Sequence, residues 1–70
     1  MFVVSEDLAN ATDPKVHRTS CSHYQRWQRE GSETTTWHGP YETREEAWKI
    51  CQRVAKKIDK QPVEAACCMN

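Results

Sequence analysis

The stretch 37–48 constrains the fold of this chain more than any other part of the sequence. Residues 34–37 are β-branched or aromatic, which favours an extended strand. Gly39-Pro40 follows and is expected to break that strand. Thr43-x-x-Glu46 is a capping box, in which Thr43 caps a helix and Glu46 reaches back to it. The stretch therefore predicts a strand, a tight turn and a capped helix in immediate succession.

The predicted helix runs from about Arg44 to about Asp59 and has two different faces. Pro62 prevents its continuation. Apolar side chains recur on one stripe at helical spacing, at Ala47, Ile50, Cys51, Val54 and Ile58. Cations occupy the opposite face, at Lys49, Arg53, Lys56 and Lys60. One face is therefore expected to join the core, and the other to form a basic partner or nucleic-acid surface.

Three further segments have β-type patterns, namely 2–4, 15–19 and 63–68. A polar stretch ending at Pro14 separates the first two segments, so they are predicted to pair as a hairpin. A short helical turn is predicted within 20–29. The order β-β-(short α)-β-α-β predicts an α+β fold: a small, mostly antiparallel sheet of three or four strands with one long helix packed on one face.

The length of 70 residues predicts a single small domain, residues 1–70, with a modest core. Only 37% of the residues are hydrophobic, so a disulfide, a metal ion or a partner chain is expected to supplement that core. Trp37 and Tyr41 are expected to pack under the long helix. Trp48, at the edge of the apolar stripe, is expected to stay half exposed.

A candidate metal site combines His17-x3-Cys21 with Cys67-Cys68 at the end of the chain. Zinc prefers about four nitrogen or sulfur ligands in a tetrahedron. A histidine and a cysteine at the end of one strand would meet the last cysteines if the two strands are neighbours, and His23 is a further possible ligand. Three interpretations stay open: a structural zinc site, reduced thiols with Cys21 a buried hydrophobe, and a disulfide or redox role.

Catalysis is not expected. Cys51 lies on the apolar stripe of the long helix, where a buried free thiol is usually inert. His17 and Cys21 have no orienting partner or oxyanion loop at recognisable spacing. The chain has two Gly in total, without a Gly-rich phosphate loop. The sequence therefore predicts a binding or interaction domain and no enzyme.

The charges balance overall but are distributed in blocks. Ten Lys and Arg face ten Asp and Glu, and this net charge of zero argues against a protein built mainly to hold nucleic acid. One basic block without acids, within 15–29, nevertheless contains Tyr24 and Trp27, a pattern that can hold single-stranded nucleic acid. Two alternatives follow: a nucleic-acid accessory protein that uses the basic helix face, and a structural homodimer that covers Trp48.

The start of the chain predicts a cytoplasmic protein without membrane contact. Its first apolar run, 1–4, is too short for a signal peptide or a membrane span. Thiols stay reduced in the cytoplasm, which favours free thiols or a metal over disulfides.

Two family resemblances are present. Val16-His17-Arg18-Thr19-Ser20-Cys21, the helix start 41–47 and the terminal cysteines resemble a group of small bacterial domains with His-x3-Cys and a closing Cys-x2-Cys, which are similar to the zinc module of the Ada DNA-repair protein. This resemblance covers residues 16–68 and implies a zinc site on His17, Cys21 and the terminal cysteines. The closing pair departs from the pattern, because Cys67 and Cys68 are adjacent.

The second resemblance is to the SPOR peptidoglycan-binding domain. Its repeated βα unit is similar to 37–47, and the likeness extends over residues 36 to about 58. A SPOR domain has two such units, whereas this chain has one. The resemblance implies a strand-turn-helix unit and a binding role.

Overall fold

The computed structural model describes residues 1–9 and 12–65. Its strands and helices are, in chain order, β1 (Phe2–Asp7), β2 (Lys15–Arg18), α1 (Ser22–Glu30), β3 (Thr35–Tyr41), α2 (Arg44–Ile58) and β4 (Val63–Glu64). The sheet has the order β3-β1-β2-β4. β1 is antiparallel to β2 and β3, and β4 is parallel to β2. The predicted α+β fold with a mostly antiparallel sheet is confirmed.

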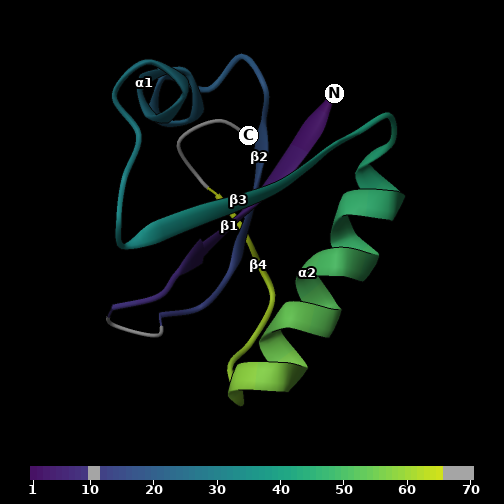
Figure 1. Cartoon of the computed structure of the whole chain (residues 1–70). Helices are drawn as coiled ribbons and strands as arrows, with labels where there is room; N and C mark the ends of the chain where they lie inside the picture. Colours follow the sequence, from purple (N-terminus) through teal and green to yellow (C-terminus); the bar gives the residue numbers. More distant parts are fainter. Residues whose placement is uncertain (10–11, 66–70) are drawn as a thin grey trace.

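Two small cores lie on the two faces of the sheet. Val4 and its cross-strand partner Val16 are fully buried with Ala47 of α2. Val3 points to the opposite face, where it packs with Tyr24 of α1. Successive residues of a strand point to opposite faces, so one short strand serves both cores. The two helices accordingly lie on opposite sides of the sheet, as Figure 1 shows.

The boundaries of α2 follow from local chemistry. The Glu46 N–H donates to Thr43 Oγ1 at 3.2 Å, which satisfies one of the unpaired donors of the first turn. The Thr43 hydroxyl in turn donates to Glu46 Oε1 at 3.3 Å. The bond from the Glu46 N–H to the Thr43 side chain is one of the two that define the predicted capping box, so half of that box is present. Asp59 ends the helix in the left-handed conformation, with φ 58°. The predicted helix is thus confirmed at both ends.

The apolar stripe of α2 is confirmed in its centre. Ala47, Cys51 and Val54 are buried, and Ala55, which the periodicity did not include, is buried with them. Ile50 and Ile58 at the margins are partly buried. Trp48 is also partly buried and packs against the margin of this core, as expected.

The prediction that Gly39-Pro40 breaks the strand is wrong. β3 continues through both residues to Tyr41, with a register shift opposite Phe2 and Val4. A proline is tolerated here because β3 is an edge strand. Gly39 has φ +113°, and a Cβ on it would lie 3.1 Å from the Phe2 carbonyl oxygen.

The irregularity changes which face each residue of β3 presents. Before it, His38 pairs with Val4 and faces α2, so Trp37 faces α1. After it, Tyr41 pairs with Phe2 and faces α2. An extra residue in one strand reverses the alternation beyond it. Tyr41 therefore packs under α2 as predicted, whereas the prediction that Trp37 does so is wrong.

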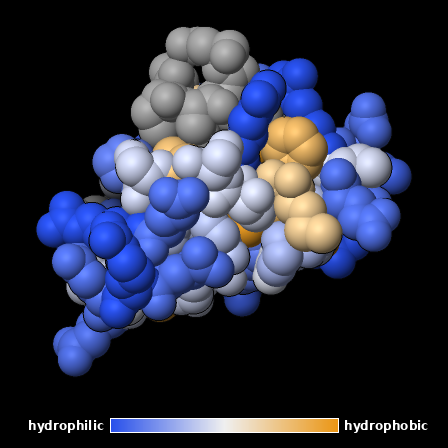
Figure 2. All heavy atoms as spheres, turned by 90° about the horizontal axis from the view of Figure 1, so that it is seen from above, coloured by the Kyte–Doolittle hydropathy of each residue, from blue (hydrophilic) through white to orange (hydrophobic). Residues whose placement is uncertain are grey.

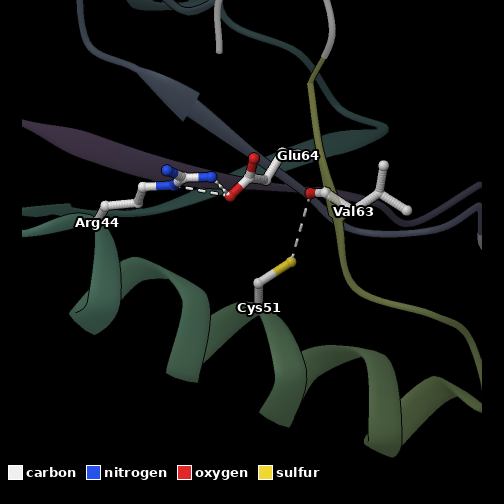
Figure 3. A network of polar contacts seen from close by, with 4 residues as sticks. All are labelled: Arg44, Cys51, Val63 and Glu64. Atoms are coloured by element: carbon white, nitrogen blue, oxygen red, sulfur yellow. Dashed lines mark hydrogen bonds and ion pairs between the residues drawn. The ribbon is translucent and has the colours of Figure 1, made fainter. Parts of the chain in front are cut away.

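Contacts with the segment 14–16 and with α2 hold β4 in place. The Val63 N–H donates to the Pro14 carbonyl at 3.1 Å, and the Ala65 N–H donates to the Val16 carbonyl at 2.9 Å. Figure 3 shows the side of β4 that faces α2, where Arg44 is paired with Glu64 and the Cys51 thiol points to the Val63 carbonyl. Of the predicted strand 63–68, residues 63–64 are confirmed and residues 66–68 lie outside the described part.

Replacing the cap of α2 gives a direct test of this local chemistry. We expect Thr43→Ala to lower the free energy of unfolding by about 1 kcal/mol, because the Glu46 N–H loses its acceptor. Thr43→Ser keeps the hydroxyl and should stay within about 0.5 kcal/mol of the wild type. Urea unfolding followed by circular dichroism measures both. Equal losses in the two variants would contradict a capping role.

Candidate metal centre

The end of β2 and the start of α1 bring His17 and Cys21 together. A turn joins the two elements, in which the Cys21 N–H donates to the Arg18 carbonyl at 2.9 Å. Cys21 is the N-cap residue of α1, with an extended backbone. Its Sγ lies 3.6 Å from His17 Nδ1. Cys21 is 5% exposed and His17 is 6% exposed, so the contact is shielded from solvent.

This separation suits a shared metal ion. A tetrahedral zinc ion with Zn–N of about 2.0–2.1 Å and Zn–S of about 2.3 Å holds its nitrogen and sulfur ligand atoms about 3.6 Å apart. The observed distance between His17 Nδ1 and Cys21 Sγ is 3.6 Å. The same distance also fits a thiol–imidazole hydrogen bond. The pair could therefore hold a zinc ion or form a direct hydrogen bond without rearrangement.

The other side of the His17 ring is fixed as well. Its Nε2 lies 3.0 Å from Ser5 Oγ, and the Ser5 hydroxyl is also 3.4 Å from the Lys15 carbonyl. The ring centroid is 4.8 Å from that of Trp37. Burial lowers the pKa of His17 to about 4, with smaller contributions from the charges of His23 and Lys15. The imidazole is therefore neutral near pH 7, as a metal ligand must be.

An aromatic cluster attaches α1 to the sheet. The ring of Trp37 lies 5.3 Å from that of Tyr24 and 6.2 Å from that of Trp27, measured between centroids. Tyr24 is buried and Trp27 is partly buried. Trp37 Nε1 is buried and has no hydrogen-bond partner among the residues that the structure describes, which costs stability. The packing of three rings offsets this cost and fixes the helix whose N-cap is Cys21.

A hollow of about 380 Å³ opens beside the pair. Its floor includes Ser5 and His17 from the strands, and Trp37 lines it from β3. His23 of α1 and Ala65, directly after β4, form part of its wall. The chain therefore leaves its last strand at the edge of the same hollow that contains His17.

The structure brings together half of the predicted ligand set. His17 and Cys21 are in contact, whereas Cys67 and Cys68 lie outside the described residues. Within residues 1–9 and 12–65, no group of three or more His, Cys, Asp or Glu side chains is placed to hold a metal ion. His23 lines the hollow but belongs to no such group in that part of the chain.

Cys51 has a structural environment on the other face of the sheet. Its thiol donates to the Pro14 carbonyl at 3.2 Å. Burial raises the pKa of the Cys51 thiol, and a backbone hydrogen bond with Val63 opposes this only in part. A buried thiol that stays protonated is a poor nucleophile, in agreement with the inert role expected for Cys51.

The basic face of α2 consists of Lys49, Arg53, Lys56 and Lys60, and all four are exposed. Lys57, which the sequence reasoning left out, is exposed beside them. Among the described residues, none of these five cations takes part in an ion pair. The basic block within 15–29 differs, because Arg26 is paired with Glu30 and Tyr24 is buried. Tyr24 is therefore unavailable for stacking on a ligand.

Sequence reasoning missed two residues that contact His17, namely Ser5 and Trp37. Ser5 pairs with Lys15 across the hairpin, and Val3 pairs with His17, so both β1 residues share a face with the histidine. The hairpin register is the signal that would have placed Ser5 near His17. Trp37 joins the site from the far edge of the sheet, and the strand irregularity after it obscures its direction.

Comparison with protein-family models, with curated proteins and with solved structures finds no match to this chain. The family resemblances inferred from the sequence therefore remain hypotheses. No helix in the described part of the chain is long and apolar enough to cross a membrane.

Tyr24 gives a test of how α1 is held. We expect Tyr24→Ala to lower the free energy of unfolding by about 3 kcal/mol, because a buried aromatic side chain is lost. Tyr24→Phe removes only the hydroxyl, which accepts from Gln28 Nε2 at 3.2 Å, and should cost less than about 1 kcal/mol. Urea unfolding and amide exchange in α1 measure the effect. Unchanged exchange in Tyr24→Ala would show that other contacts hold this helix.

Proposed function

We propose that this chain is a small cytoplasmic binding module stapled by one zinc ion, and that it acts by binding, without catalysis. His17 and Cys21 supply two ligands, and the terminal pair Cys67-Cys68 supplies at least one further thiolate. The observation that carries the proposal is the 3.6 Å distance between His17 Nδ1 and Cys21 Sγ, which equals the ligand separation of tetrahedral zinc.

The position of β4 supports a contribution from the terminal cysteines. The sequence hypothesis required the last strand to neighbour the strand that carries His17, and β4 pairs with β2. Ala65 donates to the carbonyl of Val16, the residue before His17. The described chain therefore ends beside the strand that carries His17.

The surroundings of the two ligands also favour a metal. Zinc requires a neutral imidazole and a thiolate. The pKa of His17 is lowered to about 4, so the imidazole is neutral near pH 7. When bound, zinc would cross-link β2, α1 and the end of the chain. Such a link supplements a core as small as this one. The resemblance to Ada-like zinc modules agrees with this ligand set.

Metal analysis tests the proposal. We expect about one zinc ion per chain by elemental mass spectrometry of protein purified without chelator. Chelation should lower the melting temperature, because free zinc at about 100 times its Kd adds about 2.7 kcal/mol to the stability of the folded state. Cys21→Ser should abolish stoichiometric zinc binding. Of Cys67→Ser and Cys68→Ser, a variant that lacks a binding thiolate should abolish it as well.

Cys51→Ala is the matched control for these variants. It removes a cysteine from the opposite face of the sheet, far from the pair, and should leave the zinc content unchanged. Metal-free wild-type protein with four reactive thiols, and with a melting temperature that chelator does not change, would contradict the zinc site.

A second candidate function, binding of nucleic acid by the α2 face, is favoured by the cluster of cations without ion-pair partners among the described residues. Such cations can neutralise phosphates and release counterions. The net charge of zero limits the expected affinity. A homodimer that covers Trp48 is the remaining alternative, and sedimentation at high concentration would test it.

Charge reversal tests the nucleic-acid candidate. We expect Arg53→Glu with Lys56→Glu to weaken binding of single-stranded oligonucleotides and to reduce the slope of log K against log salt by about 1.4, or about 0.7 per lost phosphate contact. Arg18→Glu with Arg29→Glu is a control of equal charge outside α2. Fluorescence anisotropy over a range of salt concentrations measures both. Equal affinities for the wild type and the α2 variant would exclude this face.

A further inference from the structure

We infer that Trp48 is the base-stacking platform of a site for single-stranded nucleic acid: an unpaired base lies against its indole in a hollow beside α2, and the phosphates of the strand contact the exposed cations of that helix. This inference rests on the second candidate function, the binding of nucleic acid by α2, and does not depend on a zinc ion. It assigns that function a stacking residue and a place for the base.

The hollow lies where the first turns of α2 face β4. Its volume is about 410 Å³, which is within the range of small-ligand sites, about 300–1,000 Å³. Arg44 of α2 is paired with Glu64 of β4, as Figure 3 shows, so an ion pair links the two elements that line it. The indole of Trp48 lines the hollow together with five polar side chains, those of Arg44, Glu45, Lys49, Gln52 and Glu64.

Trp48 is restrained by the core and is still accessible. Its side chain is partly buried and packs against the core cluster that contains Val4 and Ala47. The same side chain lines the hollow, so part of the ring is open to a ligand. Every base has a flat π-face that stacks on an aromatic ring. A ring that the fold already holds in place loses little freedom when a base stacks on it.

The charges divide this surface into a balanced part and a basic part. Of the five polar side chains that line the hollow, two are cations and two are carboxylates. The hollow therefore suits an uncharged group such as a base better than it suits a phosphate or a carboxylate. From residue 49 to residue 60, five cations stand against one acid, Asp59. This basic part suits phosphates, whose charge such cations neutralise.

The helix places the two parts side by side. Trp48 and Lys49 are consecutive, and both line the hollow. Arg53 and Lys56 follow Lys49 at spacings of four and three residues, which puts them on one side of α2 over a length of about 10 Å. All three cations are exposed, and none takes part in an ion pair within the described part of the chain. A strand can therefore place one base on Trp48 while its phosphates follow the cations.

The first test uses the wild-type chain and two strands of equal charge. We expect a fluorescein-labelled oligothymidylate of about ten nucleotides to bind about 10-fold more tightly than an abasic strand of the same length, because only the first offers bases to Trp48. Fluorescence anisotropy at low salt measures both affinities. Equal affinities would overturn the role of Trp48, since phosphates alone would then account for the binding.

Variants of Trp48 locate the stacking contact. Trp48→Leu keeps an apolar side chain without a ring, and we expect it to weaken oligothymidylate binding about 10-fold. Its affinity for the abasic strand and its salt slope should equal those of the wild type. Trp48→Phe keeps a ring and should stay within about threefold of the wild type. Trp27→Leu is the matched control, because it removes a partly buried tryptophan from α1 on the other side of the sheet, and it should match the wild type.

The outcomes separate this inference from the function on which it rests. A wild-type chain that binds neither strand at low salt would refute nucleic-acid binding by α2, and the stacking role with it. Binding that Arg53→Glu with Lys56→Glu weakens and that Trp48→Leu leaves unchanged would refute the stacking role alone. A loss of affinity in Trp27→Leu without one in Trp48→Leu would place the base on α1 and overturn the inference.

A polyanion without bases completes the test. We expect polyglutamate of matched charge to compete with the oligothymidylate no better than the abasic strand does. Competition equal to that of unlabelled oligothymidylate would show a surface that binds any polyanion, and would overturn the inference. If Trp48→Leu does not fold, the comparison of the two strands on the wild-type chain still decides whether a base is bound.

Discussion

The fold depends on β1, because this strand pairs on both edges and is buried on both faces. Val3 and Val4 are each fully buried, one under the aromatic cluster of α1 and the other under α2. Ser5 follows them and contacts His17. Three consecutive residues therefore connect both cores to the candidate metal centre. A chain of 70 residues cannot build a thick core, and a strand shared by two thin cores is a physical solution to that limit.

The features that local chemistry determines were predictable from the sequence. α2 begins at its Thr43 cap and ends near Asp59, because capping and helical periodicity act within a few residues. The direction of Trp37 was not predictable in the same way. It depends on the irregularity in β3 opposite Phe2 and Val4, and this is a property of pairing between distant segments. The α+β class was predictable because the order of elements is sufficient to indicate it.

The candidate site was likewise predictable from the sequence only in part. The spacing His17-x3-Cys21 indicated a pair, and a strand end followed by a helix N-cap brings the two side chains within 3.6 Å. The parallel pairing of β4 with β2 was stated only as a condition, since no local signal gives the order of strands. Ser5 and the ring of Trp37 were missed because their contacts with His17 require the register of two strand pairs.

The free edge of β3 bears on how such a domain meets a partner. The Leu8 N–H donates to the Thr34 carbonyl, so Thr34 faces β1 and the backbone of Thr35 faces away from the sheet. That outward Thr35 N–H donates to Ser32 Oγ at 3.2 Å. Further along, Gly39-Pro40 lacks a regular pattern of donors. Both ends of the edge are thus blocked against strand addition. Recognition by this domain is then expected to depend on exposed side chains. The cations of α2 are exposed and take part in no ion pair among the described residues, so they are one such group. Figure 2 shows one face of the molecule, on which hydrophobic residues form one patch and a few smaller spots among mostly hydrophilic residues.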